Sequence, residues 1–97
     1  MNNVRSIRKD WDLIESLIGD NSRILDIGCG EGDLIQQLEK NLAAKVHGIE
    51  KSRDLALKGI AKGLNVTHGD AEKDLLQYAN HSFDYVILSQ TLQAMIE

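Results

Sequence analysis

The chain has 97 residues, which is enough for one small domain. Its formal net charge is -4, and it has no excess of lysine and arginine of the kind that nucleic-acid-binding proteins carry, so we expect no nucleic-acid partner. Its single cysteine cannot form an internal disulfide, which favours a reducing, cytoplasmic location, and no apolar run is long enough for us to expect a membrane partner.

The first predicted element is an amphipathic helix over about residues 4–18. Its apolar residues recur at steps of three and four, which places them on one helical face: Val4, Ile7, Trp11, Ile14 and Ile18. This periodicity assigns Trp11 to the core. A position over a ligand cleft is the alternative interpretation of the same residue.

Short β-type runs and helices alternate along the rest of the chain. We predict strands over residues 23–27, 45–50, 65–68 and 83–88. We predict helices over residues 33–42 and 52–62, a brief helix or turn over 72–79, and the opening of another helix over 91–97. Ser52 is the expected N-cap of the second of these helices, and Gly63 is expected to end it.

This alternation implies right-handed βαβ crossovers and a parallel sheet. The sequence therefore predicts one α/β domain over residues 1–97, with a Rossmann-like doubly wound sheet. Because such a sheet normally continues beyond its fourth strand, we expect the domain to be partial, truncated after the fourth strand.

The first predicted strand ends in a glycine-rich loop with glycines at 28, 30 and 32. Glycines let the backbone turn tightly and approach a ligand, and the helix that follows points free N–H groups at a bound carboxylate. Asp26 can accept a hydrogen bond from an ammonium group. Together these features suit the zwitterionic amino-acid end of S-adenosylmethionine (SAM), whereas the alternative is a tight turn without a ligand.

Polar residues end the other three strands, at the edge where doubly wound sheets bind ligands. Glu50 can accept two hydrogen bonds from a ribose diol. Asp70 can accept from an adenine amino group, and the amide of Ala71 can donate to the ring. Ser89 is expected to face the methionine portion and the sulfonium. The structural alternatives are a solvated acid for Glu50, a turn residue for Asp70 and a polar loop for Ser89.

Other chemistries are disfavoured by spacing. A dinucleotide fingerprint places its third glycine three residues after the second, where this chain has Asp33 and therefore a negative charge beside a pyrophosphate. Cys29 has no evident base nearby, so we assign it to the SAM loop rather than to nucleophilic catalysis. The histidines lack metal-ligand spacing, so we expect no metal, and no catalytic residue is assigned.

These motifs resemble class I SAM-dependent methyltransferases, through R-I-L-D-I-G-C-G-E-G at residues 23–32, the acid at Glu50 and H-G-D at 68–70. The chain is more closely similar to the MetW family of methionine-biosynthesis proteins. That resemblance is carried by F-D-Y-V-I-L-S-Q-T-L-Q-A at 83–94, by R-K-D-W-D-L-I at 8–14 and by G-I-E at 48–50. It extends over nearly the whole chain but only about the first half of a family member.

The resemblance implies two alternative functions. The first is a SAM-dependent methyltransferase of methionine biosynthesis, with an unidentified acceptor and S-adenosylhomocysteine (SAH) as its product. The second is a non-catalytic SAM-binding partner or regulator of homoserine O-acyltransferase. The SAM loop serves both, and the acceptor pocket and any catalytic base are expected in the missing C-terminal half.

Overall fold

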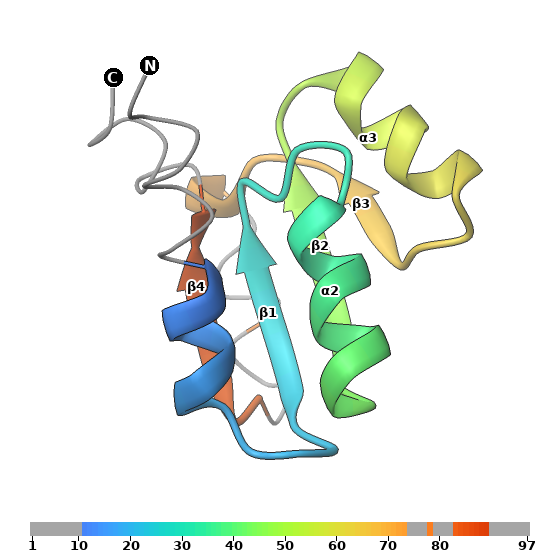
Figure 1. Ribbon diagram of the computed structural model, residues 1–97. Helices are drawn as coiled ribbons and strands as arrows, with labels where there is room; N and C mark the ends of the chain where they lie inside the picture. The colour runs from blue at the N-terminus through green and yellow to red at the C-terminus, as the bar shows by residue number, and fades with distance from the viewer. Residues whose placement is uncertain (1–10, 74–77, 79–82, 90–97) are drawn as a thin grey trace, which may run out of the picture.

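The computed structural model describes residues 11–73, 78 and 83–89. Its strands and helices alternate as the sequence predicts (Figure 1), in the order β1 (Arg23–Ile27), α2 (Asp33–Leu42), β2 (Lys45–Glu50), α3 (Arg53–Ala61), β3 (Val66–His68) and β4 (Tyr85–Leu88). Residues 11–17, 71–73 and 78 are also helical. The remaining parts of the predicted helices at 4–18, 72–79 and 91–97 lie outside the described residues, apart from Ile18, which ends the first of them.

The four strands form one parallel sheet in the order β3-β2-β1-β4. β1 is flanked by β2 on one side and β4 on the other, with Ile24 in register with both Val46 and Tyr85. The strand order therefore reverses at β1, and a doubly wound sheet binds its ligands beside the carboxyl end of the strand at such a point. The predicted α/β class and parallel sheet are confirmed.

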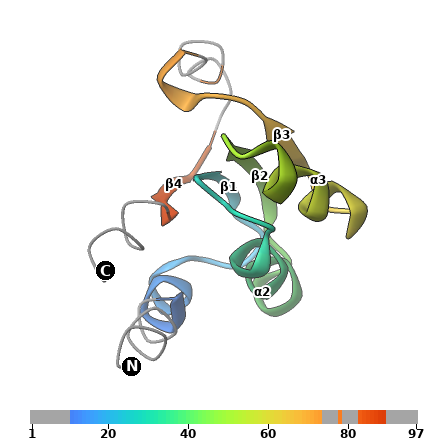
Figure 2. The ribbon, with the colours of Figure 1, turned by 90° about the horizontal axis from the view of Figure 1, so that it is seen from above.

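Helices and turns cover both faces of the sheet. Viewed from above, α2 and the helix of residues 11–17 lie on one side, and the turn at 71–73 lies on the other (Figure 2). The larger buried cluster lies on the α2 side and includes Ile24, Leu34, Ile35, Leu38 and Val46. The smaller cluster consists of Leu25, Ile49 and Tyr78. Successive side chains of a strand point to opposite faces, so Asp26 shares the α2 side with Ile24.

The ends of α3 follow from two residues that the sequence singles out. Ser52 is the N-cap, and its Oγ accepts a hydrogen bond from the amide of Leu55 at 3.4 Å. Gly63 follows the helix with a φ of 83°, a conformation that favours glycine.

The sequence predicts a strand that begins at Phe83, but β4 begins at Tyr85. Asp84 lies just before it and pairs with the start of β1. Its Oδ2 accepts from the amide of Arg23 at 2.8 Å, and its own amide donates to the carbonyl of Arg23 at 2.7 Å. Because a side chain takes the place of a backbone acceptor, the regular ladder starts one residue later.

The helix of residues 11–17 is docked against α2 by polar side chains. Gln37 Nε2 donates to Asp12 Oδ1 at 3.2 Å and to Glu15 Oε1 at 3.0 Å, and Asn41 Nδ2 donates to Glu15 Oε1 at 2.8 Å. The bonds from Asn41 and then Gln37 hold the pKa of Glu15 below its usual value. Trp11 and other apolar residues of this helix pack against the larger cluster. The helix is therefore fixed beside α2 by both polar and apolar contacts.

Gly48 lies where the glycine-rich loop crosses β2. A Cβ at this position would lie 2.6 Å from Cys29 Sγ and 2.7 Å from Ile35 Cδ1, closer than real Cβ contacts come. The loop and α2 therefore pack against bare backbone at Gly48, which sets how closely the loop approaches the sheet.

We expect Gly48→Ala to lower the free energy of unfolding by about 1–3 kcal/mol, because the added methyl group overpacks the contact with Cys29 and Ile35. Gly19→Ala is the matched control, since a Cβ there would meet only Ser22 Oγ at 3.7 Å. Urea unfolding monitored by circular dichroism measures both variants. Equal stability of the two variants would contradict the packing argument.

Candidate functional site

A cleft of about 450 Å³ opens at the carboxyl end of the sheet. Four of the predicted site residues line it together: Gly28, Cys29, Gly30 and Glu50. The cleft thus lies between the loop after β1 and the end of β2, beside the point where the strand order reverses. This is where a doubly wound sheet is expected to bind a ligand.

The glycine-rich loop is tied to β2 by its own amides. Gly28, Gly30 and Gly32 all have positive φ values, of 76°, 61° and 93°. The amides of Gly28 and Cys29 both donate to the carbonyl of Ile49, at 2.8 and 3.2 Å. The backbone groups that we expected to meet a ligand in this part of the loop therefore already have acceptors.

The first turn of α2 offers the remaining donors. α2 begins at Asp33, and its N-cap, Gly32, makes no side-chain hydrogen bond to the helix. The amides of the first turn have no acceptor within an α-helix, and the helix dipole adds a partial positive charge at that end. The start of α2 thus offers donors for a ligand carboxylate, and the ion pair of Asp33 with Lys62 at 3.1 Å offsets the negative charge of the helix's first residue.

Glu50 joins the glycine-rich loop to the start of α3. Its side chain is buried, with 8% exposed, and its two oxygens accept from the amides of Gly30 and Ser52, each at 2.7 Å. Charge-assisted bonds of this kind are stronger than neutral ones. Each carboxylate oxygen keeps a second lone pair, so these contacts leave acceptor capacity for a ligand in the cleft.

Asp26 lies beneath the loop and is fully buried. Its Oδ1 accepts a hydrogen bond from Ser89 Oγ, and its Oδ2 has no hydrogen-bond partner among the described residues. Burial raises the pKa of Asp26 to about 7, and the negative charge of Glu50 adds to the effect, while the bond from Ser89 opposes it. Ser89 is itself buried, so its hydroxyl serves Asp26.

Asp70 and Ala71 follow β3 and are not in the lining of the cleft. Asp70 caps a turn, because its Oδ1 accepts from the amide of Glu72 at 3.0 Å and its carbonyl accepts from the amide of Lys73 at 3.1 Å. Ala71 packs against the smaller cluster. The amide of Gly69 donates to the carbonyl of Glu50, so this turn still begins beside the end of β2.

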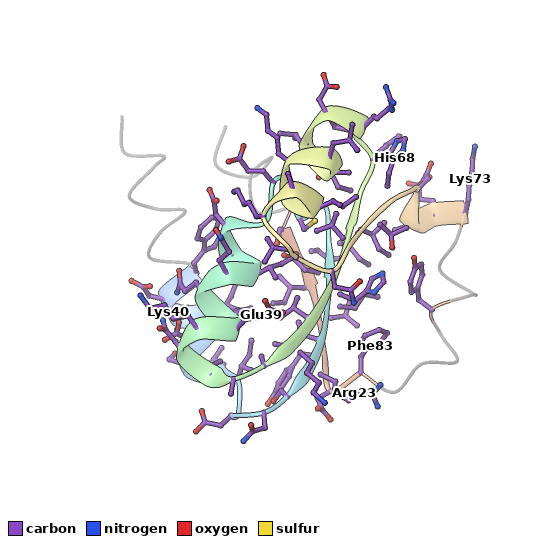
Figure 3. All side chains as sticks on the ribbon, turned by 90° about the vertical axis from the view of Figure 1, so that its right-hand side faces the viewer. Arg23, Glu39, Lys40, His68, Lys73 and Phe83 are labelled. Carbon is purple, nitrogen blue, oxygen red and sulfur yellow. The ribbon has the colours of Figure 1, made fainter. Side chains whose placement is uncertain are left out.

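A second hollow lies at the other end of the sheet. It measures about 540 Å³, and its lining includes Arg23, Glu39 and Phe83 but none of the predicted site residues. Figure 3 shows Arg23 and Phe83 at the opposite end of the molecule from His68, which ends β3. The predicted residues therefore select the cleft at the carboxyl ends.

The cleft also contains residues that the sequence analysis did not assign to the site: Trp11, Glu31, Asp33, Ser52 and Leu55. Ser52 was predicted only as a helix cap. Trp11 satisfies both interpretations of its position, since it packs against the larger cluster and lines the cleft. Helical periodicity gives its face of the helix but not which end of the sheet it meets.

Cys29 is unsuited to nucleophilic catalysis in this structure. Burial, followed by the negative charges of Asp26 and Glu50, raises the pKa of its thiol to about 12. The thiol stays protonated at neutral pH, and the thiolate is the reactive form. Within the described ranges, no group of three or more histidine, cysteine, aspartate or glutamate residues is placed to hold a metal ion.

None of the helices in the described part of the chain combines the length and apolarity needed to cross a membrane.

Sequence comparison identifies relatives in methionine biosynthesis. A family model described as "Methionine biosynthesis protein MetW" matches residues 8–97. A relative from Rhodopirellula baltica, the bifunctional methionine biosynthesis protein MetXA/MetW, is 29% identical over 98 residues. That match covers 93% of this chain and 16% of the relative.

Solved structures share the fold. A TehB-like SAM-dependent methyltransferase from Corynebacterium glutamicum has a TM-score of 0.68 at 25% identity, over 79% of this chain and 41% of that one. The plantazolicin methyltransferase BamL, solved with a triazolic desmethylPZN analog and SAH, has a TM-score of 0.63 at 27% identity, over 87% and 34%. The predicted class I methyltransferase-type fold is confirmed, and the chain spans less than half of each relative.

We expect Asp26→Asn to raise the free energy of unfolding at about pH 8 and to leave it nearly unchanged at about pH 4. The pKa of Asp26 rises from 3.8 to about 7 on folding, so the folded state binds the proton more tightly than the unfolded state does. The wild type therefore loses stability as the pH rises through this window, and the uncharged asparagine does not.

One pKa unit corresponds to about 1.4 kcal/mol, so the difference at the higher pH is on the order of a few kcal/mol. Urea unfolding of both proteins across the pH range measures it, and Ser89→Ala tests the opposing contribution of the hydroxyl. Parallel stability profiles for wild type and Asp26→Asn would contradict the assignment.

Proposed function

The chain belongs to the MetW family of methionine-biosynthesis proteins, and on this basis we propose that its cleft binds SAM as a methyltransferase-like protein of that pathway. The observation that carries the proposal is the meeting of Gly28, Gly30 and Glu50 in one cleft beside the start of α2. The cleft volume of about 450 Å³ falls within the range of small-molecule sites.

The residues present fit the charges of SAM. The amides at the start of α2 suit its carboxylate, and the free lone pairs of Glu50 suit the hydroxyls of its ribose. Asp26 is fully buried and does not line the cleft, but its Oδ2 has no partner among the described residues, and we propose that its negative charge beneath the loop favours an ammonium group above it. We propose that Asp70 and Ala71 support the ligand from the turn after β3, that Ser89 acts through its hydrogen bond to Asp26, and that Cys29 and Gly32 contribute backbone positions of the loop.

SAM supplies an electrophilic methyl carbon beside its sulfonium, with SAH as the product of transfer. The described residues contribute binding and orientation, which convert a bimolecular encounter into a positioned one. The acceptor and its general base are assigned to no described residue. The free, buried thiol of Cys29, which forms no disulfide, supports our proposal of a reducing compartment such as the cytoplasm.

A second candidate function is favoured by the relative from Rhodopirellula baltica, whose name joins MetXA and MetW in one bifunctional protein. Such a fusion supports physical association between a MetW-type domain and a second enzyme of methionine biosynthesis, for which the family resemblance suggests homoserine O-acyltransferase. In that case SAM, a downstream product of the pathway, binds the cleft of this chain and thereby regulates the partner enzyme.

We expect the wild type to bind SAM and SAH, and Glu50→Gln to bind SAM roughly ten-fold more weakly, because an amide accepts fewer and weaker bonds than a carboxylate. Glu39→Gln on α2 is the matched control, since Glu39 lines the other hollow. Isothermal titration calorimetry measures the affinities, and circular dichroism confirms that each variant is folded. Absence of binding by the wild type at about 1 mM of either ligand would exclude the proposed function.

Methyl release separates the two candidate functions. If the protein is a methyltransferase, we expect SAH to form from SAM when the intermediates of methionine biosynthesis are supplied as candidate methyl acceptors. If it is a regulator, the rate of homoserine O-acyltransferase is expected to change with SAM while no SAH forms. The assay is run with and without the acyltransferase, and the Glu50→Gln variant serves as the binding-deficient control in both arms.

A further inference from the structure

Trp11 brings an aromatic ring to the proposed SAM cleft from outside the glycine-rich loop. It is partly buried and lines the same cleft as Gly28, Gly30 and Glu50. It also belongs to the helix that precedes β1, so this part of the cleft lining comes from an element other than the glycine-rich loop.

The position of Trp11 is held by the docking of its helix. Glu15 lies four residues further along, on the same side of the helix, and accepts from both Gln37 and Asn41 of α2. Asp12, the neighbour of Trp11, accepts from Gln37 as well. These bonds fix the first described turn of the helix against α2, whose first residue, Asp33, also lines the cleft.

The charges of the cleft lining favour a cation. Glu31, Asp33 and Glu50 contribute three carboxylates to the cleft lining. Lys62 forms ion pairs with Glu31 at 3.2 Å and with Asp33 at 3.1 Å, so one ammonium group is shared between two of them. Glu50 is held by backbone amides, which carry no net charge. The lining to which Trp11 belongs is therefore acidic on balance.

An indole ring is the strongest aromatic partner for a cation, and its attraction grows where water is excluded. SAM and SAH differ in this respect, because SAM carries a sulfonium and SAH a neutral thioether. From the presence of Trp11 and these carboxylates in one cleft we infer that Trp11 is a specificity-determining residue that contacts the sulfonium of SAM and makes the cleft prefer SAM over SAH. This inference rests on the proposed function.

The ratio of SAH to SAM dissociation constants tests the inference. We expect the wild type to bind SAM more tightly than SAH, and Trp11→Leu to reduce this preference by roughly three- to thirty-fold, the range of a cation–π contact. Trp11→Phe keeps an aromatic face and is expected to retain most of the preference. Leu17→Ala, on the exposed side of the same helix, is the control and leaves the ratio unchanged.

Tryptophan fluorescence provides a second readout, since Trp11 is the single tryptophan among the 97 residues. We expect its emission to change when SAM is added to the wild type. If Trp11→Leu weakens SAM and SAH equally, the residue acts only through packing and the inference is overturned, while the proposed function stands. If the wild type binds neither ligand, the proposed function and this inference both fail.

Discussion

The hydrogen bonds of the Glu50 carboxylate are the constraint on which the site depends. One buried side chain at the end of β2 holds the amide of Gly30 on one side and the amide of Ser52 on the other. It thereby sets the distance between the glycine-rich loop and the start of α3, the two sides of the cleft. A buried carboxylate is stable only with such donors, so the fold and the proposed ligand contact need the same residue.

Asp26, in contrast to Glu50, is a buried carboxyl group whose hydrogen bonds are incomplete. Its carboxyl group is buried with one oxygen unpartnered among the described residues, and its raised pKa reports the free-energy cost of ionising it there. Strongly perturbed carboxyl groups gather at functional sites, because the interaction that would relieve them is supplied by a ligand. The two carboxyl groups at neighbouring strand ends therefore have opposite effects. Ionised Asp26 destabilises the protein without a ligand, whereas Glu50 holds the glycine-rich loop and the start of α3 in place.

Periodicity and turn chemistry predicted the four strands, α2, α3 and the cap at Ser52, since these depend on residues close in the chain. The contacts made by Gly48 could not be predicted, because they depend on Cys29 and Ile35 from other elements. The hydrogen bonds of the loop amides to the carbonyl of Ile49 could not be predicted either, since Ile49 lies beside the loop only when β2 is paired with β1. Trp11 lines the cleft because its helix docks against α2, and the periodicity of a single helix does not predict where that helix docks.

The protonated thiol of Cys29 has a consequence for how this region withstands oxidants. Peroxides and alkylating reagents attack thiolates, and a group that is both buried and protonated offers them neither charge nor access. Because Cys29 Sγ packs closely over Gly48, we expect modification to be fastest when the glycine-rich loop moves away from the sheet. The rate at which a thiol reagent labels the native protein then becomes a direct measure of how often this loop opens.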